Sequence, residues 1–197
     1  MVKSRLQKAW VLGGIVFSFL CQPFCFSAAQ DVDTYFDRGS QDLNQGNLEQ
    51  AVSDFTKVIE LDPKTHEAYY NRGAAKASIF AKENPLARTK TFVVGDCPLL
   101  SEAIGDFTRA IDIAPDKFQY YLARGSAYIF IRQTKNAVTD LTRAIELNPG
   151  QADIYFNRGL AYILSGDIKD GWADIDKSKK MGYAPPKEAM DNLEKMK

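Results

Sequence analysis

One spacing constrains this chain more than any other feature: a short motif of an aromatic residue, then Arg and Gly, recurs along it. The glycines of the four copies are Gly39, Gly73, Gly125 and Gly159. They stand 34, 52 and 34 residues apart, so the middle interval is one period of 34 plus an insertion of 18. A fixed period in the range of about 20 to 50 residues is typical of repeat folds. The sequence therefore predicts a stack of like units rather than a single globular core.

A second block follows each copy of the motif and predicts a second helix. These blocks begin at Ala51, Ala103, Ala137 and, more weakly, Gly171. Apolar residues recur three and four apart within a block, as at Ala51, Phe55 and Val58, which is helical spacing. Three blocks close with a proline, at Asp62-Pro63, Ala114-Pro115 and Asn148-Pro149. Because proline cannot continue a helix, each unit is expected to be two antiparallel helices with a defined end.

This pattern resembles the tetratricopeptide repeat (TPR) family, whose 34-residue unit has an aromatic, Leu-Gly, Tyr, later Ala, an aromatic, Ala and a closing Pro. The resemblance covers residues 32 to about 183. It departs at Arg38, Arg72, Arg124 and Arg158, where Leu is common. The resemblance implies an all-α fold, a right-handed superhelical solenoid of antiparallel helix pairs with a C-terminal capping helix. The expected units are repeats at 32–65, 66–117, 118–151 and 152–185, a capping helix at 186–197, and an insertion at about 80–99 inside the second repeat.

Small and charged residues at fixed places predict how the two helices of a unit meet. Helices approach to about 8 Å only where side chains are small, so the motif glycines are expected to face the small residue of the second helix. Each unit also places an Arg before its Gly and an Asp in its second helix. The pairs are Arg38 with Asp54, Arg72 with Asp106, Arg124 with Asp140, and Arg158 with Asp174. We hypothesise an ion-pair ladder; the alternative is independent solvated charges, since exposed pairs contribute only about 0 to 1 kcal/mol.

The first 29 residues have the pattern of a signal peptide. Lys3, Arg5 and Lys8 precede an uncharged apolar run from residue 9 to 20, shorter than the ~20 residues that span a bilayer. Small residues then predict cleavage after Ala29. The alternative is an uncleaved membrane anchor. Cleavage would shift the net charge from 0 to −3 and leave Cys97 as the only cysteine. The chain is therefore expected to be exported, to a bacterial periplasm in first place, with an extracellular or membrane-anchored location as the alternative.

Composition argues against several classes of function. Lys+Arg and Asp+Glu both number 25 and are spread without long runs, so no nucleic-acid partner is expected. The only histidine is His66, which leaves a metal cluster or a Ser/His/Asp triad nothing to build on. The glycines form no phosphate-binding loop. We expect no enzyme activity, no metal, no cofactor and no small-molecule substrate.

The TPR resemblance implies a concave groove, lined by the first helices, that receives a peptide or partner segment. The expected lining is Phe36, Asp37, Tyr70, Asn71, Leu122, Ala123, Phe156 and Asn157, with Asp33, Glu67, Gln119 and Asp153 at the rim. This lining suits an apolar or mildly basic peptide whose backbone bonds the Asn amides. The alternative is that some of the aromatics are buried seams. The chaperone-binding subclass grips a carboxylate with cations and Asn residues; here only Asn71 agrees, so that function is not expected.

The insertion and the lone cysteine are two further candidates for contact. Phe92, Val93 and Val94 form an apolar triplet that is either a contact surface or a cover folded back on the array. Cys97 precedes Pro98, a potential first helical residue, where a thiol can have a lowered pKa and form an intermolecular disulfide. The alternative is a half-buried cysteine without chemistry. The leading hypothesis is a non-enzymatic interaction scaffold, and the alternative is a self-associating structural subunit of an envelope assembly, a homo-oligomer that uses the insertion or Cys97.

Overall fold

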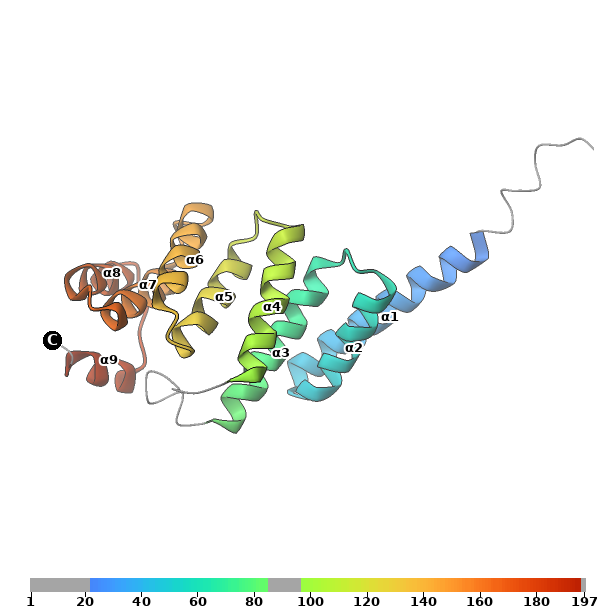
Figure 1. The fold of residues 1–197 in the computed structure, drawn as a ribbon, viewed down its shortest axis with the longest axis horizontal. Helices are drawn as coiled ribbons and strands as arrows, with labels where there is room; N and C mark the ends of the chain where they lie inside the picture. Colours follow the sequence, from blue (N-terminus) through green and yellow to red (C-terminus); the bar gives the residue numbers. More distant parts are fainter. Residues whose placement is uncertain (1–21, 85–96, 196–197) are drawn as a thin grey trace, which may run out of the picture.

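The computed structural model describes residues 22–84 and 97–195, and these residues are helical throughout apart from short turns (Figure 1). The helices they form are α1 (Gln22–Gln45), α2 (Leu48–Leu61), α3 (His66–Glu83), α4 (Pro98–Ile113), α5 (Phe118–Phe130), α6 (Thr134–Leu147), α7 (Ala152–Ser165), α8 (Ile168–Lys180) and α9 (Lys187–Glu194). The all-α fold class predicted from the sequence is confirmed.

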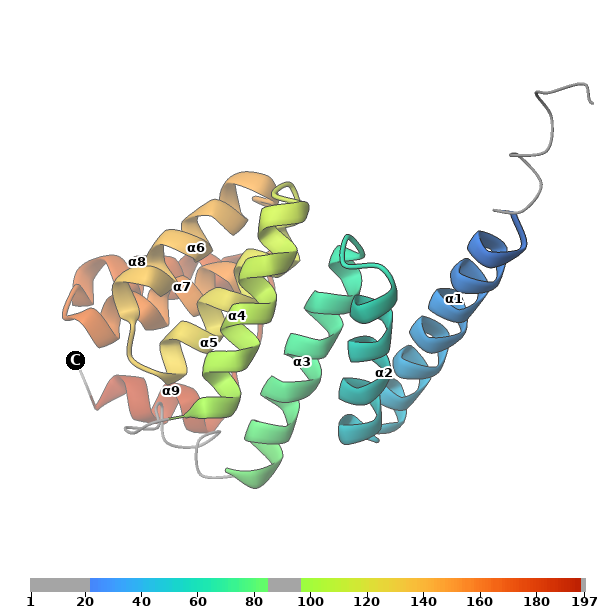
Figure 2. The same cartoon turned by 45° about the vertical axis from the view of Figure 1, so that its right-hand side comes forward.

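Consecutive helices pair into four hairpins: α1 with α2, α3 with α4, α5 with α6, and α7 with α8. Each hairpin also packs on the next one through its second helix, so the array grows along the long axis of the molecule (Figure 1). Figure 2 shows α1 projecting beyond the array at its N-terminal end. One hairpin cannot bury its apolar face alone, and the stacking of neighbours supplies the core.

The helix ends lie where proline and glycine predict them. Helices α2, α4 and α6 end at the residue before Asp62, Ala114 and Asn148, each of which is followed by proline. Within hairpins 1 and 4 the turn is made by a glycine in the left-handed region, Gly46 at φ +80° and Gly166 at φ +96°. A left-handed backbone costs glycine little, which explains its place there.

The other two hairpins depart from this turn. Hairpin 3 has Arg132 at the equivalent place, at φ +57°, where a non-glycine residue is uncommon. In hairpin 2 the equivalent residue is Phe80, which stays helical, and α3 continues to Glu83. On the far side of the insertion, Pro98 is the first residue of α4, as its rigid φ favours. The flanks of the insertion therefore lengthen two helices.

The core follows the repeat. Second-helix residues at one recurring place are almost fully buried: Phe55, Phe107, Leu141 and Ile175. The first aromatic of each motif copy is buried to a different extent: Tyr69 and Tyr155 are buried, whereas Tyr35 and Tyr121 are half-buried. Burying side chains of this size stabilises the fold by about 1.5 to 3 kcal/mol each.

The motif glycines mark the closest approaches between helices. A Cβ added at Gly73 would lie 2.7 Å from the Phe107 ring and 3.2 Å from the Ala103 carbonyl oxygen. At Gly159 it would lie 2.6 Å from the backbone oxygen of Gly171. These two glycines therefore face the small second-helix residues that the sequence singled out.

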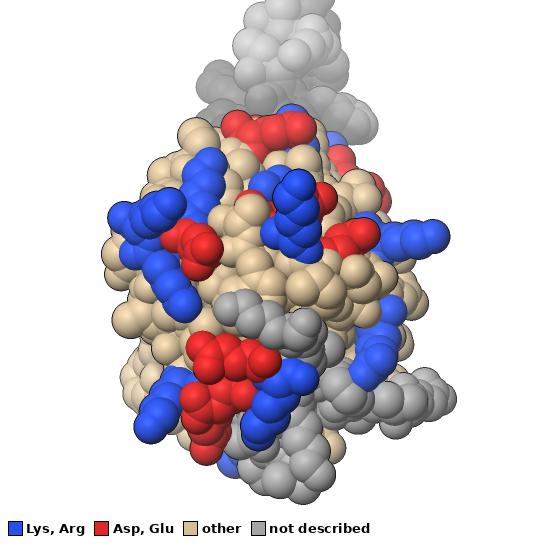
Figure 3. Space-filling view, turned by 90° about the vertical axis from the view of Figure 1, so that its left-hand side faces the viewer, with Lys and Arg blue, Asp and Glu red and all other residues tan. Residues whose placement is uncertain are grey.

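The C-terminal end of the array is closed by α9. Leu193 is completely buried against Phe156, Ile163 and Ile175 of the last hairpin. Viewed from this end, Lys and Arg are interspersed with Asp and Glu, and neither sign forms a continuous field (Figure 3).

Two predicted features lie largely or wholly outside the described residues. The signal-peptide core (9–20) and the apolar triplet Phe92, Val93 and Val94 are both outside them. The predicted cleavage position after Ala29 falls within α1. The signal peptide with its cleavage position and the role of the apolar triplet therefore stay predictions.

Candidate functional site

All four predicted Arg–Asp pairs are formed, each between the two helices of one hairpin. In every pair the Arg donates two parallel hydrogen bonds, from Nε and Nη2, to the two carboxylate oxygens. The Nε to Oδ2 distance is 2.7 Å for Arg124 with Asp140 and for Arg158 with Asp174. The hydrogen bond to Asp140 raises the pKa of Arg124. This two-point geometry is the strong form of a carboxylate pair.

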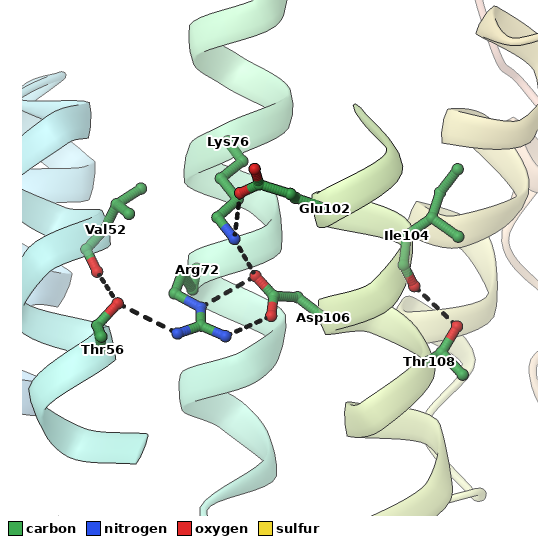
Figure 4. Close-up of polar contacts among 8 residues, drawn as sticks. All are labelled: Val52, Thr56, Arg72, Lys76, Glu102, Ile104, Asp106 and Thr108. Atoms are coloured by element: carbon green, nitrogen blue, oxygen red, sulfur yellow. Dashed lines mark hydrogen bonds and ion pairs between the residues drawn. The ribbon is translucent and has the colours of Figure 1, made fainter. Parts of the chain in front are cut away.

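A threonine connects three of the four pairs to the preceding hairpin. Arg72 Nη1 donates to Thr56 Oγ1 of α2 at 3.1 Å, and the Thr56 hydroxyl donates to the Val52 carbonyl at 2.7 Å (Figure 4). The same bond recurs from Arg124 to Thr108 and from Arg158 to Thr142. The ladder therefore joins the second helices α2, α4, α6 and α8. Arg38 lies in the first hairpin of the described residues, where no such threonine bond is present, and its side chain is 55% exposed.

Hairpin 2 adds a second cation to this ladder. Lys76 Nζ lies 3.0 Å from Asp106 Oδ2 and 3.1 Å from Glu102 Oε2, and the Lys76 side chain is buried (Figure 4). Asp106 thus accepts from both Arg72 and Lys76. Since buried charges persist only when paired, the role of this cluster is structural. The cations of the ladder are paired with carboxylates of the second helices. A binding surface for a partner is therefore sought on the other face of the first helices.

The predicted groove residues lie on the first helices, and three of the four large apolar ones are partly exposed. Phe36, Tyr70 and Leu122 are half-buried. Asp37 is exposed, and Asn71, Ala123 and Asn157 are half-buried. Within the described residues, neither Asn amide is engaged in a hydrogen bond. We call the surface of α1, α3, α5 and α7 that carries these residues the groove face.

The prediction for Phe156 is wrong. Its side chain is only 5% exposed, and its ring packs on Tyr183 with centroids 5.3 Å apart. Tyr183 belongs to the segment that leads into α9, which seals this end of the groove face. Phe156 is therefore part of the core, and the open part of the face lies over the first three hairpins.

An aromatic cluster connects hairpins 2 and 3 at one end of this face. The rings of Tyr70 and Tyr120 lie 4.8 Å apart, and the Tyr120 oxygen lies 2.7 Å from His66 Nδ1. Burial, with smaller contributions from nearby acids beginning with Glu67, raises the pKa of Tyr120 to about 12. Burial also raises the pKa of Tyr70. Both phenols are thus neutral at physiological pH and hold α3 against α5.

A cavity of about 250 Å³ opens between α3 and α5 with α4 behind it. Its lining is Ala74, Ala77, Phe80, Ala81, Leu100, Phe107, Ala123, Ser126, Ala127 and Phe130. Ser126 is the one polar side chain among them, and its hydroxyl donates to the Leu122 carbonyl at 2.7 Å. We call this cavity the anchor pocket. Of the predicted groove residues, Ala123 lines it directly.

The sequence explains why the pocket lies in this hairpin. At the place four residues after the motif glycine, the other hairpins carry Leu43, Ile129 and Ile163, whereas hairpin 2 carries Ala77. The extra turn of α3 that precedes the insertion then adds Phe80 and Ala81 as a wall. Our sequence reasoning missed these residues, although comparing the four units place by place would have singled out Ala77.

The structure decides against chemistry at the cysteine. Cys97 is 8% exposed and packs in the core cluster with Phe80 and Leu100. A thiol in that position is not available to a second protein molecule. Its burial fits the alternative of a structural residue.

Two other features are absent from the described residues: a metal site and a membrane-spanning helix. No group of three His, Cys, Asp or Glu side chains in residues 22–84 and 97–195 has the arrangement of a metal site. Nor does any helix in these two ranges combine the length and the hydropathy needed to cross a membrane.

Comparison with known proteins identifies the repeat. Residues 39–78 and 133–166 match the TPR repeat family. A segment of 43 residues is 46% identical to the protein SGT1 homolog of Oryza sativa subsp. japonica, which covers 22% of this chain and 12% of that protein. Residues 39–78 and 133–166 are therefore similar to TPR repeats. The match to the curated relative spans only about an eighth of that protein.

Solved structures show the same architecture. The crystal structure of MamA protein superposes with a TM-score of 0.65 at 23% identity, over 78% of this chain and 74% of MamA. The first TPR of Spaghetti (RPAP3), bound to the HSP90 peptide SRMEEVD, superposes with a TM-score of 0.53 at 18% identity, over 75% of this chain and 94% of that domain. At these identities the likeness establishes a TPR-type helical fold.

Proposed function

We propose that this chain is a non-enzymatic protein-interaction scaffold that binds a peptide or partner segment on its groove face. The observation that carries the proposal is the anchor pocket, an apolar cavity between α3 and α5. The half-buried Tyr70 packs on one of its lining residues, Phe107, with ring centroids 6.0 Å apart. An apolar hollow of this kind is typical of a site for a partner. The peptide bound to the RPAP3 TPR domain supports the same use of the fold.

The charges of this face favour a neutral or basic partner. Asp33, Asp37 and Glu67 are exposed on α1 and α3. The peptide bound by RPAP3, SRMEEVD, is acidic in its second half. An acidic segment would be repelled here, so the partner of this chain differs in chemistry from that peptide.

Peptide selection tests the proposed function. We expect the mature chain, immobilised, to enrich nine-residue peptides from a random phage library. Asn71→Ala should weaken the selected peptides about tenfold, because the lost amide bonds the peptide backbone at about 0.5 to 1.5 kcal/mol per hydrogen bond. Isothermal titration calorimetry measures the affinity. Ser53→Ala, on the outer helix α2, is the matched control and should change nothing.

Two results would contradict this proposal. One is a library from which no peptide rises above background. The other is a set of peptides that respond to Ser53→Ala and ignore Asn71→Ala, because binding would then lie on the outer helices.

We propose further that the chain is exported, to a bacterial periplasm in first place, by cleavage of residues 1–29. The support is the basic start, the short apolar run and the small residues before Gln30. Expression of the full chain in a bacterial host should yield a periplasmic product whose intact mass corresponds to residues 30–197. A cytoplasmic product that keeps its N-terminus would contradict export, and a membrane-bound one of full mass would indicate an uncleaved anchor.

A further inference from the structure

We infer that the anchor pocket binds one large apolar side chain, aromatic or branched aliphatic, of a partner segment that carries a basic residue about three positions away. This inference rests on the proposed function and specifies the partner of the same face. It joins two features of α3, the pocket at Ala74 to Ala81 and the exposed carboxylate of Glu67.

The pocket has the size and chemistry for one such side chain. An engineered apolar cavity of about 150 Å³ stays dry and binds benzene. The anchor pocket encloses about 250 Å³, and three phenylalanines line it: Phe80, Phe107 and Phe130. With the Ser126 hydroxyl proton donated to Leu122, the lining gives a polar ligand atom no free donor. A polar side chain would therefore lose its hydration without replacement, while an apolar one would gain.

The hollow results from two departures from the repeat, the small residue Ala77 and the extra turn of α3 at Phe80. Leu43, Ile129 and Ile163 fill the equivalent place in the other three hairpins, and Ala77 leaves it open. An unfilled site of this kind costs stability, since lining atoms lose their contacts. A partner side chain that enters from outside would restore those contacts.

The carboxylate of Glu67 is the reason for expecting a basic residue in the partner. It lies seven residues before Ala74 on the same side of α3, which is about 10 Å along the helix axis. An extended peptide covers about 3.3 Å per residue, so a cation near Glu67 would be about three residues from the anchor side chain. The Glu67 side chain is 52% exposed, so a partner cation can reach its carboxylate, whose Oε2 also lies 3.2 Å from His66 Nδ1. The Tyr70 ring lies between, and the stem of a Lys or Arg can pack along it.

The experiment uses end-blocked, fluorescein-labelled ten-residue peptides in a Gly/Ser background. Each contains Phe and Lys separated by two serines, in both orders, and control peptides replace Phe by Ser or Lys by Glu. We expect the mature chain to bind the peptides with one of the two orders of Phe and Lys. Replacing Phe should weaken this binding at least tenfold. Ala77→Ile should also weaken binding at least tenfold, because it places in the hollow the residue found in the other hairpins. Glu67→Gln should weaken binding about threefold.

The matched control is Ser53→Ile, which adds the same side chain on the exposed face of α2 and should leave binding unchanged. Circular dichroism checks that all variants stay folded. Since isoleucine is native at this place in two hairpins, Ala77→Ile is expected to melt no lower than the parent chain.

Four outcomes overturn the inference. If Ala77→Ile has no effect while Asn71→Ala still weakens the phage-selected peptides, the groove function stands and the anchor fails. If neither probe nor selected peptides bind, both fail. If binding appears only when residues 85–96 are replaced by a Gly-Ser linker, the pocket serves the chain itself. If light scattering shows a dimer that Ala77→Ile dissolves, the occupant is a second copy.

Discussion

Replacing Asp106 by Asn should destabilise this protein by about 3 to 5 kcal/mol, the range for breaking a buried ion pair. Asp106 is the shared partner of Arg72 and Lys76, whose side chains are only 17% and 11% exposed. Without the carboxylate charge, two buried cations face each other with only Glu102, which is itself exposed, to offset them. The midpoint temperature of thermal unfolding should fall by about 6 to 20 °C, because each kcal/mol corresponds to about 2 to 4 °C for a chain of this size.

The matched control is Asp54→Asn, at the same place in hairpin 1. Its partner Arg38 is 55% exposed and can turn into water, so the expected loss is about 0 to 1 kcal/mol. Urea midpoints of both variants measure the difference. Equal small losses would mean that water reaches the hairpin 2 cluster and that the ladder contributes no more than surface pairs do.

The second large effect is a pair of Gly→Ala substitutions with opposite signs. A Cβ at Gly159 would lie 2.6 Å from the Gly171 backbone oxygen and 2.9 Å from Ile175 Cγ1. A helix must move to make room, at a cost of about 1 to 3 kcal/mol in the free energy of unfolding. Gly105 lies within α4 with nothing inside 4 Å of its added Cβ. Gly105→Ala should therefore stabilise the protein by about 0.5 to 1 kcal/mol.

Chemical denaturation of both variants decides this prediction. The account requires Gly159→Ala to unfold at lower urea than the parent chain and Gly105→Ala at higher urea. If both Gly→Ala substitutions stabilise the protein equally, helix propensity dominates. The close approach of α7 to α8 would then not constrain the sequence.

Much of the fold could be predicted because the same local physics acts in every unit. The period, the proline after Asp62 and the glycine at position 166 depend only on backbone geometry, so the sequence alone places the helix ends. The Arg–Asp ladder could be proposed from spacing because both partners recur with the period. The threonines that join neighbouring hairpins recur in the same way, so their spacing also predicts them.

The site was harder to predict because it depends on where the repeat is broken. Phe156 occupies the same place as Tyr70, yet Tyr183 and α9 cover it, because the chain turns back there after the last unit instead of adding another one. The anchor pocket likewise arises from a missing side chain at Ala77 and an extra turn at Phe80. A pattern search finds what recurs, and these features are defined by what does not.

Hydrogen–deuterium exchange of residues 30–197, with and without a selected peptide at saturation, tests whether a partner lies on the first helices of hairpins 2 and 3. The account predicts slower exchange of backbone amides in α3 and α5 and unchanged exchange in α2 and α6. Protection confined to the outer helices, or to the closed end at α9, would contradict it.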